Sequence, residues 1–315
     1  MTRIKKGIIY SIIGILAVVV LATIGGSFYM LDFALAPEVN RSDTAACYKR
    51  LFDTYPETRQ WVDSLREKEA LRDTFVTMPT GERHHALYVD KGSSKTALIV
   101  HGWRDCAIDF LFLARIYELM GYNVVMPDLH AHGLSEGDMI QMGWRDRKDV
   151  LHWLSIFLTD TMVVHGVSMG AATTMMMSAE PLPKRIKDIR FVADCAYTSA
   201  WDEFEGELSN QFGLPPFPIL HASSMLCKLQ YGWSFGEASA IEQVKRCRQP
   251  MLFIHGNSDT FVPTGMVYRL FKAKPSKKSL WTTEGAGHAE SYGKHKKEYV
   301  QRVRQFVTGK SHETF

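Results

Sequence analysis

The sequence has few cysteines and little charge of one sign. Its five cysteines among 315 residues are odd in number and widely spaced, and no two form a C-x-x-C pair. This pattern fits neither a disulfide framework nor a zinc site. The net charge is only +3, and the basic runs within residues 272–278 and 294–297 are short. We interpret them as solvated surface and expect no nucleic-acid partner.

Metal-ligand motifs are missing as well. Histidines occur at residues 84–85, 130 and 132, but no H-E-x-x-H motif, third ligand at helical spacing or carboxylate cluster accompanies them. A catalytic zinc site needs such a set. We therefore interpret these histidines as surface or loop residues, and we expect neither a metal nor an organic cofactor.

Long apolar runs are confined to the N-terminus. Residues 7–31 are uncharged and mostly apolar, and about 25 such residues suffice to cross a bilayer with some tilt. A cleaved signal peptide is the alternative, but its apolar region is usually only about 7–15 residues long. The one tidy cleavage signal, at residues 34–36, is followed by Pro37, which should hinder cleavage. The segment therefore predicts a retained transmembrane helix within residues 1–36.

The charges that flank this segment predict its orientation. Arg3, Lys5 and Lys6 precede it, whereas Asp32 and Glu38 follow it. By the positive-inside rule the N-terminus lies in the cytoplasm and the rest of the chain lies outside the cell membrane. We expect a single-pass protein whose anchor makes the membrane a partner.

The remaining chain alternates between strand and helix patterns after a helical juxtamembrane stalk at residues 37–73. The expected strands are residues 74–78, 85–90, 97–100, 122–126, 162–167, 191–193, 251–255 and 280–283. Apolar strands that alternate with helices predict an α/β fold with a mostly parallel eight-stranded sheet covered on both faces. The core comprises residues 74–198 and 236–315, and residues 199–235 interrupt it as a small helical lid.

A G-x-S-x-G motif lies where an expected strand ends and an expected helix begins, with Ser168 at its centre. Such a turn exposes the serine on a strained corner, and Gly166 and Gly170 let the strand and helix pack closely. The bare pattern occurs by chance in about one protein in ten of this length. Its position at a strand end favours Ser168 as a nucleophile over an ordinary glycine-rich turn.

A nucleophilic serine on such a sheet is followed in chain order by an acid and a base. Asp259 lies in the turn after the seventh expected strand, and His288 lies in a glycine-rich loop after the eighth. A neutral imidazole takes the serine proton, and a carboxylate orients the imidazole. Asp194, at the end of the sixth expected strand, is the second candidate for the acid. We interpret His255 as a structural histidine of the strand end.

An acyl-transfer site also needs donors for the developing oxyanion. One backbone N–H comes from the residue after the nucleophile and another from the loop after the third expected strand. Met169 and Trp103 occupy these positions. His101 precedes the serine in the chain, so we interpret it as a structural residue of its turn and not as the base.

Residues 74–308 resemble the α/β-hydrolase superfamily, in particular its bacterial serine-hydrolase branch similar to the prolyl oligopeptidase and lysophospholipase-like enzymes. The resemblance rests on five segments in the order and spacing of the family, at residues 101–103, 127–135, 166–170, 255–259 and 287–288. It implies the α/β-hydrolase fold with a cap between strands six and seven. Leu129 and His130 depart from the Arg-Gly or Arg-Ala that relatives often carry, which concerns the shape of the substrate site.

Together these residues predict a serine hydrolase that cleaves a carboxylic ester or related acyl bond through an acyl-serine intermediate. A peptidase or amidase with the same triad is the alternative enzyme, and a catalytically silent binding protein of this fold is the alternative from another class. The aromatic lid indicates a small-molecule or lipid-like acyl substrate, or else it simply packs onto the domain. Because the site residues all follow Ile99, we expect a chain beginning near Arg41 to be soluble and active.

Overall fold

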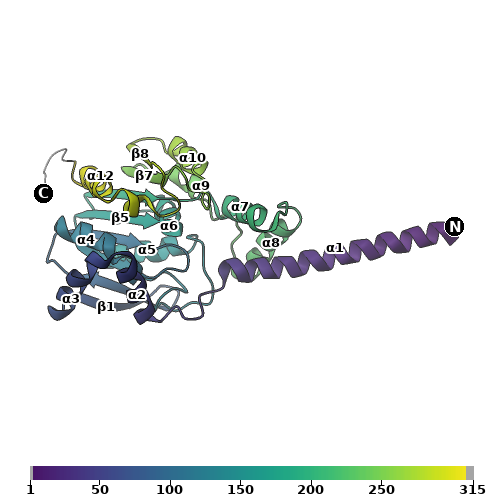
Figure 1. Ribbon diagram of the computed structural model, residues 1–315, viewed down its shortest axis with the longest axis horizontal. Helices are drawn as coiled ribbons and strands as arrows, with labels where there is room; N and C mark the ends of the chain where they lie inside the picture. Colours follow the sequence, from purple (N-terminus) through teal and green to yellow (C-terminus); the bar gives the residue numbers. More distant parts are fainter. Residues whose placement is uncertain (1–2, 310–315) are drawn as a thin grey trace.

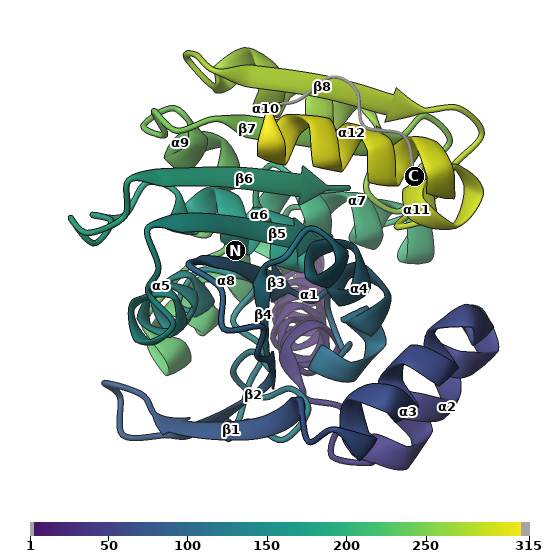
Figure 2. The same cartoon turned by 90° about the vertical axis from the view of Figure 1, so that its left-hand side faces the viewer.

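The computed structural model describes residues 3–309, and the side chains of residues 5–309. An eight-stranded sheet with the order β1-β2-β4-β3-β5-β6-β7-β8 runs through it (Figure 2). The strands are β1 Leu71–Thr77, β2 Arg83–Val89, β3 Lys95–Val100, β4 Asn123–Pro127, β5 Thr161–Val167, β6 Asp188–Asp194, β7 Met251–Gly256 and β8 Lys278–Thr283. Pairs β1–β2 and β2–β4 are antiparallel, and the others are parallel. The predicted cytoplasmic tip at residues 1–2, the side chain of Arg3 and the predicted core residues 310–315 lie outside this description.

Helices cover both faces of the sheet. They are α1 Arg3–Leu35, α2 Thr44–Thr54, α3 Arg59–Glu67, α4 Leu111–Leu119, α5 Asp146–Ile156, α6 Met169–Met177, α7 Ala200–Phe212, α8 Ile219–Tyr231, α9 Ala240–Val244, α10 Gly265–Ala273, α11 Ser291–Lys294 and α12 Lys296–Thr308, with 3-10 turns η1 Pro56–Thr58 and η2 Ala107–Phe110. Along β3, Leu98 and Val100 pack with α5, α6, α9 and α10, whereas Ala97 and Ile99 pack with α2, α4 and α12. The predicted mostly parallel α/β sheet, buried on both faces, is confirmed.

The boundaries differ from the sequence prediction where polar residues interrupt an apolar run. Strand β6 begins at Asp188 and not at residue 191, because Asp188 and Arg190 alternate with buried residues and break the apolar run that marks the strand. Strand β1 begins at Leu71, inside the segment predicted as stalk. Lys274, predicted to lie on a solvated face, is fully buried, and its ammonium donates to the backbone oxygens of Cys247 (3.1 Å) and Ser276 (2.7 Å).

The N-terminal helix α1 has 33 residues, which corresponds to a length of about 50 Å. Figure 1 shows it leaving the domain beside α7 and α8 and pointing away from the sheet. Its apolar side chains between Ile8 and Ile24 are exposed, and it is long and apolar enough to cross a membrane. Its last turns are different, because Met30, Leu31 and Leu35 are buried in the domain.

Candidate active site

The turn between β5 and α6 holds Ser168 in a rarely occupied backbone conformation, with φ 55° and ψ −121°. A Cβ on Gly166 would lie 2.1 Å from the backbone oxygen of Gly170, and a Cβ on Gly170 would lie 2.1 Å from that of Val100. No side chain fits at such distances. Both glycines of the motif are therefore required by the close approach of α6 to β5 and β3.

The structure brings together Ser168, His288 and Asp259 in one chain of hydrogen bonds. His288 Nε2 lies 2.8 Å from Ser168 Oγ, and His288 Nδ1 lies 2.8 Å from Asp259 Oδ2. The three residues follow the carboxyl ends of β5, β8 and β7. Because these strands are parallel, their carboxyl ends meet at one edge, where ligands bind in such sheets.

The carboxylate of Asp259 is held in a set of donors. Its Oδ1 accepts hydrogen bonds from the backbone N–H groups of Phe261 (3.1 Å) and Val262 (2.9 Å). Burial alone would raise its pKa, but hydrogen bonds from His255 and His288 lower the pKa of Asp259 to about 2. The carboxylate is therefore ionised near neutral pH and orients the imidazole of His288.

The sequence interpretation of His255 as a structural histidine missed its contact with Asp259. Its Nε2 lies 2.9 Å from the backbone oxygen of Val262 and 3.3 Å from Asp259 Oδ2. It is fully buried in β7, so it orients the acid and also has the structural role expected for it. The spacing of four residues from Asp259 was the available signal, but it indicates nothing until the turn geometry is known.

Asp194 was the second candidate for the acid, and its side chain contacts Tyr299. Its side chain accepts a hydrogen bond from the hydroxyl of Tyr299 (3.0 Å), and its backbone oxygen accepts one from the N–H of Ser168 (2.8 Å). Burial raises the pKa of Asp194 to about 6. His165 Nε2 lies 2.9 Å from the same Tyr299 hydroxyl. This buried network fastens α12 beneath the nucleophile turn.

Both candidate oxyanion donors lie beside Ser168. Met169 is the first residue of α6, so its N–H has no acceptor within the helix. Trp103 follows Gly102, where a Cβ would lie 3.5 Å from the Cβ of Ser168. His101 is buried, and its two ring nitrogens contact the backbone oxygen of Gly102 and the backbone N–H of Leu129.

Comparison with known proteins adds to this geometry. No protein-family model matches the chain. The uncharacterized protein YqkD of Bacillus subtilis is 26% identical over 261 residues, covering 80% of this chain and 84% of that protein. A structure of the Pyrococcus furiosus esterase Pf2001 has a TM-score of 0.61 at 21% identity, covering 79% of this chain and 96% of its own. A predicted CIB-like hydrolase from Thermoplasma acidophilum has a TM-score of 0.53 at 19% identity, covering 76% and 99%.

This chain has the α/β-hydrolase fold. The resemblance predicted from the five sequence segments is thereby confirmed at the level of the fold. The α/β-hydrolase sheet is the frame that gathers the strand ends, and the chemistry depends on the side chains placed there.

Ser168 lies between two cavities. The first has a volume of about 140 Å³ and is mainly apolar. Its walls come from α1, from α7 and α8, from the loops after β3 and β5, and from the segments around Met142, Tyr197 and Phe261. The lining residues are Gly26, Tyr29, Met30, Phe33, Ala34, Trp103, Met142, Ser168, Tyr197, Glu203, Phe204, Glu207, Leu208, Gln211, Phe212, Leu214, Ile219 and Phe261. The second, about 470 Å³, is also lined mostly by apolar and aromatic side chains, among them Tyr55, Phe110 and Phe112, but its walls include His288 and the charged Arg50, Asp105 and Asp109.

Glu203 stands out in the first cavity because it is a carboxyl group among apolar and aromatic side chains. It is buried, and its Oε2 has no hydrogen-bond partner within the described part of the chain. Burial, followed by the charge of Glu207, raises the pKa of Glu203 to about 8. It is therefore protonated near neutral pH. In the sequence it is one of several acidic residues on a helix, so nothing distinguished it.

The four histidines expected at the surface or in loops are instead buried. His85 Nδ1 lies 2.7 Å from Asp128 Oδ2 and its Nε2 lies 2.9 Å from Asp73. His130 contacts Glu82 (3.0 Å) and a backbone oxygen, and His132 Nε2 accepts a hydrogen bond from the N–H of Arg104. The expectation of surface positions was wrong for all four, whereas His130 and His132 do lie in the loop after β4. His85 and His130 reach carboxylates distant in the sequence, and His132 reaches backbone groups, so hydrogen bonds satisfy these three buried rings.

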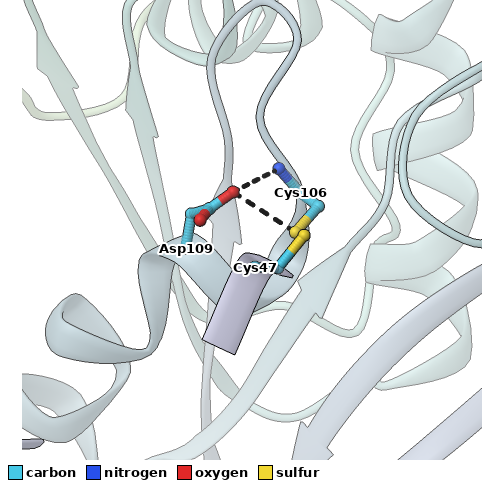
Figure 3. Close-up of side chains that lie close together, drawn as sticks. All are labelled: Cys47, Cys106 and Asp109. Carbon is cyan, nitrogen blue, oxygen red and sulfur yellow. Dashed lines mark hydrogen bonds between the residues drawn. The ribbon is translucent and has the colours of Figure 1, made fainter. Parts of the chain in front are cut away.

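A second polar cluster connects α2 to the loop after β3 (Figure 3). Cys47, Cys106 and Asp109 place their donor atoms within 4.8 Å of one another, as a metal site would require. Arg50 donates to Asp109 Oδ2 (2.8 Å) and to Cys47 Sγ (3.2 Å). A guanidinium already neutralises this cluster, so a cation would have to displace it. We interpret the cluster as a fastening of α2 to the domain.

Proposed function

We propose that this protein is a membrane-anchored serine hydrolase that cleaves carboxylic esters through an acyl-serine intermediate. The observation that carries the proposal is the hydrogen-bond chain from Ser168 Oγ through His288 to Asp259, with 2.8 Å at each step. It stands at the strand ends of an α/β-hydrolase sheet, and the nucleophile has the positive φ of a strained turn.

In this mechanism Ser168 Oγ attacks the acyl carbon while its proton passes to His288 Nε2. The backbone N–H groups of Trp103 and Met169 stabilise the oxyanion. The C–O bond to the alcohol then breaks, and His288 returns the proton to the leaving oxygen. Water, deprotonated by His288, attacks the acyl-serine, and the acid is released as Ser168 recovers its proton.

Esters are favoured over peptides by the walls of the first cavity. Aromatic and aliphatic side chains beside Ser168, among them Tyr29, Phe33 and Phe204, suit an apolar acyl group. A peptide backbone would bring N–H and C=O groups for which this lining offers few partners, among them Glu203, Glu207 and Gln211. The aromatic residues of the expected lid divide between a substrate site and packing onto the domain. Phe204 and Phe212 line the cavity, whereas Trp233 and Phe235 are buried in the core.

The test is the reaction of the full-length protein with a fluorophosphonate probe, followed by a panel of p-nitrophenyl esters of rising chain length against aminoacyl anilides. We expect covalent labelling that requires Ser168, and faster hydrolysis of esters than of anilides. Absence of labelling would overturn the enzyme proposal in favour of a silent binding protein. Faster hydrolysis of anilides would identify a peptidase or amidase.

We further propose that α1 anchors the protein in the cell membrane as a single pass, with the N-terminus cytoplasmic and the hydrolase domain outside. Support comes from its length, its exposed apolar surface and the positions of Lys5 and Lys6 in its first turns, before the apolar segment, and of Glu38 after it.

A further inference from the structure

The end of the membrane helix is part of the catalytic domain. Tyr29, Met30 and Phe33 of α1 form a wall of the first cavity, with Ser168 on another wall. The helix that carries the apolar, exposed segment continues without a break to its last turn (Figure 1), and residues of its last turns line the cavity. An anchor that served only to attach the domain would not need this arrangement.

This wall is fixed in place by hydrogen bonds to the loop beside the nucleophile. The indole of Trp103 donates to the backbone oxygen of Ala34 (2.9 Å), and the guanidinium of Arg104 donates to that of Phe33 (3.1 Å). The backbone N–H of Ile140 donates to the oxygen of Leu35 (2.7 Å). Because Trp103 is also the candidate oxyanion donor, the end of α1 and the reacting centre are held as one unit.

The opposite wall is the hairpin of α7 and α8, whose tip is apolar and exposed. Phe212, Leu214 and Phe217 are 46%, 40% and 70% exposed. The rings of Tyr29 and Phe212 meet edge to face, with their centroids 6.2 Å apart. Ile219, the first residue of α8, lies beside Gly26 of α1. The tip thus lies beside the point where the exposed part of α1 begins. With α1 across a bilayer, these side chains lie at its surface, where apolar groups are stabilised.

The two cavities at Ser168 differ in their access to the general acid. His288 lines the second cavity, with the charged Arg50 and Asp109, and it does not line the first. A leaving alcohol must take its proton from His288, so it lies on the side of the second cavity. The acyl group then occupies the first cavity, on the side of α1.

We propose that the acyl chain of a bilayer lipid ester enters the first cavity directly from the membrane, between α1 and the hairpin of α7 and α8. The carbons near the ester lie in the cavity, while the distal part of the chain stays in the bilayer. The polar alcohol portion leaves through the second cavity toward water. This inference rests on the proposed function and adds the class of substrate.

The first experiment maps where an acyl chain lies. The full-length protein in phosphatidylcholine nanodiscs is treated with a long-chain alkyl fluorophosphonate that carries a diazirine on the chain, then irradiated and analysed by peptide mass spectrometry. We expect a Ser168 adduct with cross-links to residues 26–34 of α1 and to α7. A Ser168 adduct cross-linked to the second cavity, around Tyr55 and Phe112, or to neither wall would overturn the inference and leave the esterase proposal standing. Absence of any adduct would overturn both.

The second experiment measures delivery from the bilayer. In the same nanodiscs, hydrolysis of bilayer-embedded p-nitrophenyl palmitate is divided by hydrolysis of dissolved p-nitrophenyl acetate. The double variant Pro215→Asp with Phe217→Asp, at two exposed residues of the tip that do not line the cavity, should lower this ratio about tenfold, because two charges oppose apolar contact with the bilayer.

The matched control places the same charges on exposed apolar residues elsewhere. Leu119 and Ile156 are exposed at the C-terminal ends of α4 and α5, and these helices run opposite to the parallel strands, so they end away from the site. Leu119→Asp with Ile156→Asp should leave the ratio as in the natural sequence. Equal effects of the two double variants, or no effect of either, would contradict entry at the hairpin tip.

Discussion

The side chain of Ser168 lies 2.8 Å from His288 Nε2, and its backbone adopts an unfavourable conformation. Its φ of 55° lies in a region that residues other than glycine rarely occupy, and such strain costs about 1–3 kcal/mol. The surrounding glycines and the hydrogen bond from its N–H to Asp194 hold it there. Strain of this kind at a strand end is typical of residues kept for reactivity.

Replacing Ser168 with alanine should therefore remove turnover without loss of the fold. We expect Ser168→Ala and His288→Ala each to lower kcat on p-nitrophenyl esters by several orders of magnitude, because each removes a member of a unit that acts together. Thermal unfolding of the purified variants is the control, since it should stay close to that of the natural sequence. Retention of more than about a tenth of the activity would contradict the assignment.

The two buried aspartates should separate in the same assay. Asp259→Asn should damage turnover severely, because an amide does not stabilise the imidazolium of His288 and favours the wrong tautomer. Asp194→Asn should be mild, because Asp194 contacts Tyr299 through its side chain and Ser168 through its backbone only. The reverse ranking of kcat would transfer the acid role to Asp194.

At the scale of an element, α7 carries a carboxyl group whose ionisation opposes folding. The pKa of Glu203 is about 8, against an ordinary value of 4.5. Between these values the unfolded chain has lost the proton that the folded chain keeps, so stability falls as the pH rises. The contribution reaches about 1.4 kcal/mol for each pH unit.

Glu203→Gln should remove this part of the pH dependence. Chemical unfolding in detergent, measured from about pH 3.5 to 8, should give a flatter curve for the variant than for the natural sequence. Below pH 4.5 the difference in unfolding free energy between the variant and the natural sequence should become constant. This constant difference serves as the internal reference. Parallel curves across the whole range would show that Glu203 ionises normally in the folded protein.

The sheet order explains why residues of the candidate site could be predicted from the sequence. Parallel strands that alternate with helices place their carboxyl ends at one edge, and the turns after β5, β7 and β8 then carry Ser168, Asp259 and His288 to the same place. Local turn residues and chain order were sufficient for that inference. The contact of Asp194 with Tyr299, on the distant helix α12, was not predictable in this way.

At the scale of the whole molecule, α1 is a structural part of the domain as well as a candidate membrane span. We expected from the sequence that a chain beginning at Arg41 would be soluble and active, but Met30, Leu31 and Leu35 are buried. Their loss uncovers apolar core and leaves the indole of Trp103 without its acceptor, Ala34.

The corrected expectation is that the chain beginning at Arg41 aggregates or unfolds at a lower temperature than the full chain. A chain beginning at Thr23, which keeps the last turns of α1 without the exposed span, is the matched comparison. Size-exclusion chromatography and thermal unfolding should show it to be the better folded of the two. Equal stability of both would show that α1 contributes attachment only.

Attachment itself is tested in cells. The full-length protein should remain in the membrane fraction after alkaline carbonate washing, because a helix with buried apolar surface resists treatments that remove peripheral proteins. Protease added to intact spheroplasts should digest the hydrolase domain, as the charges around α1 predict. Protection from the protease would reverse the topology, and a soluble mature form beginning near Pro37 would identify a signal peptide.

The sequence by itself determined the features that depend on local chemistry and chain order. These are the apolar N-terminal helix, the alternation of strands and helices, the serine turn and the loops that carry Asp259 and His288. The tertiary structure decided what depends on contacts between distant segments: the last turns of α1 as a cavity wall, Glu203 buried in that cavity, and His255 beside the acid. The burial of a side chain and its hydrogen-bond partners depend on packing between distant segments, which no local sequence pattern encodes.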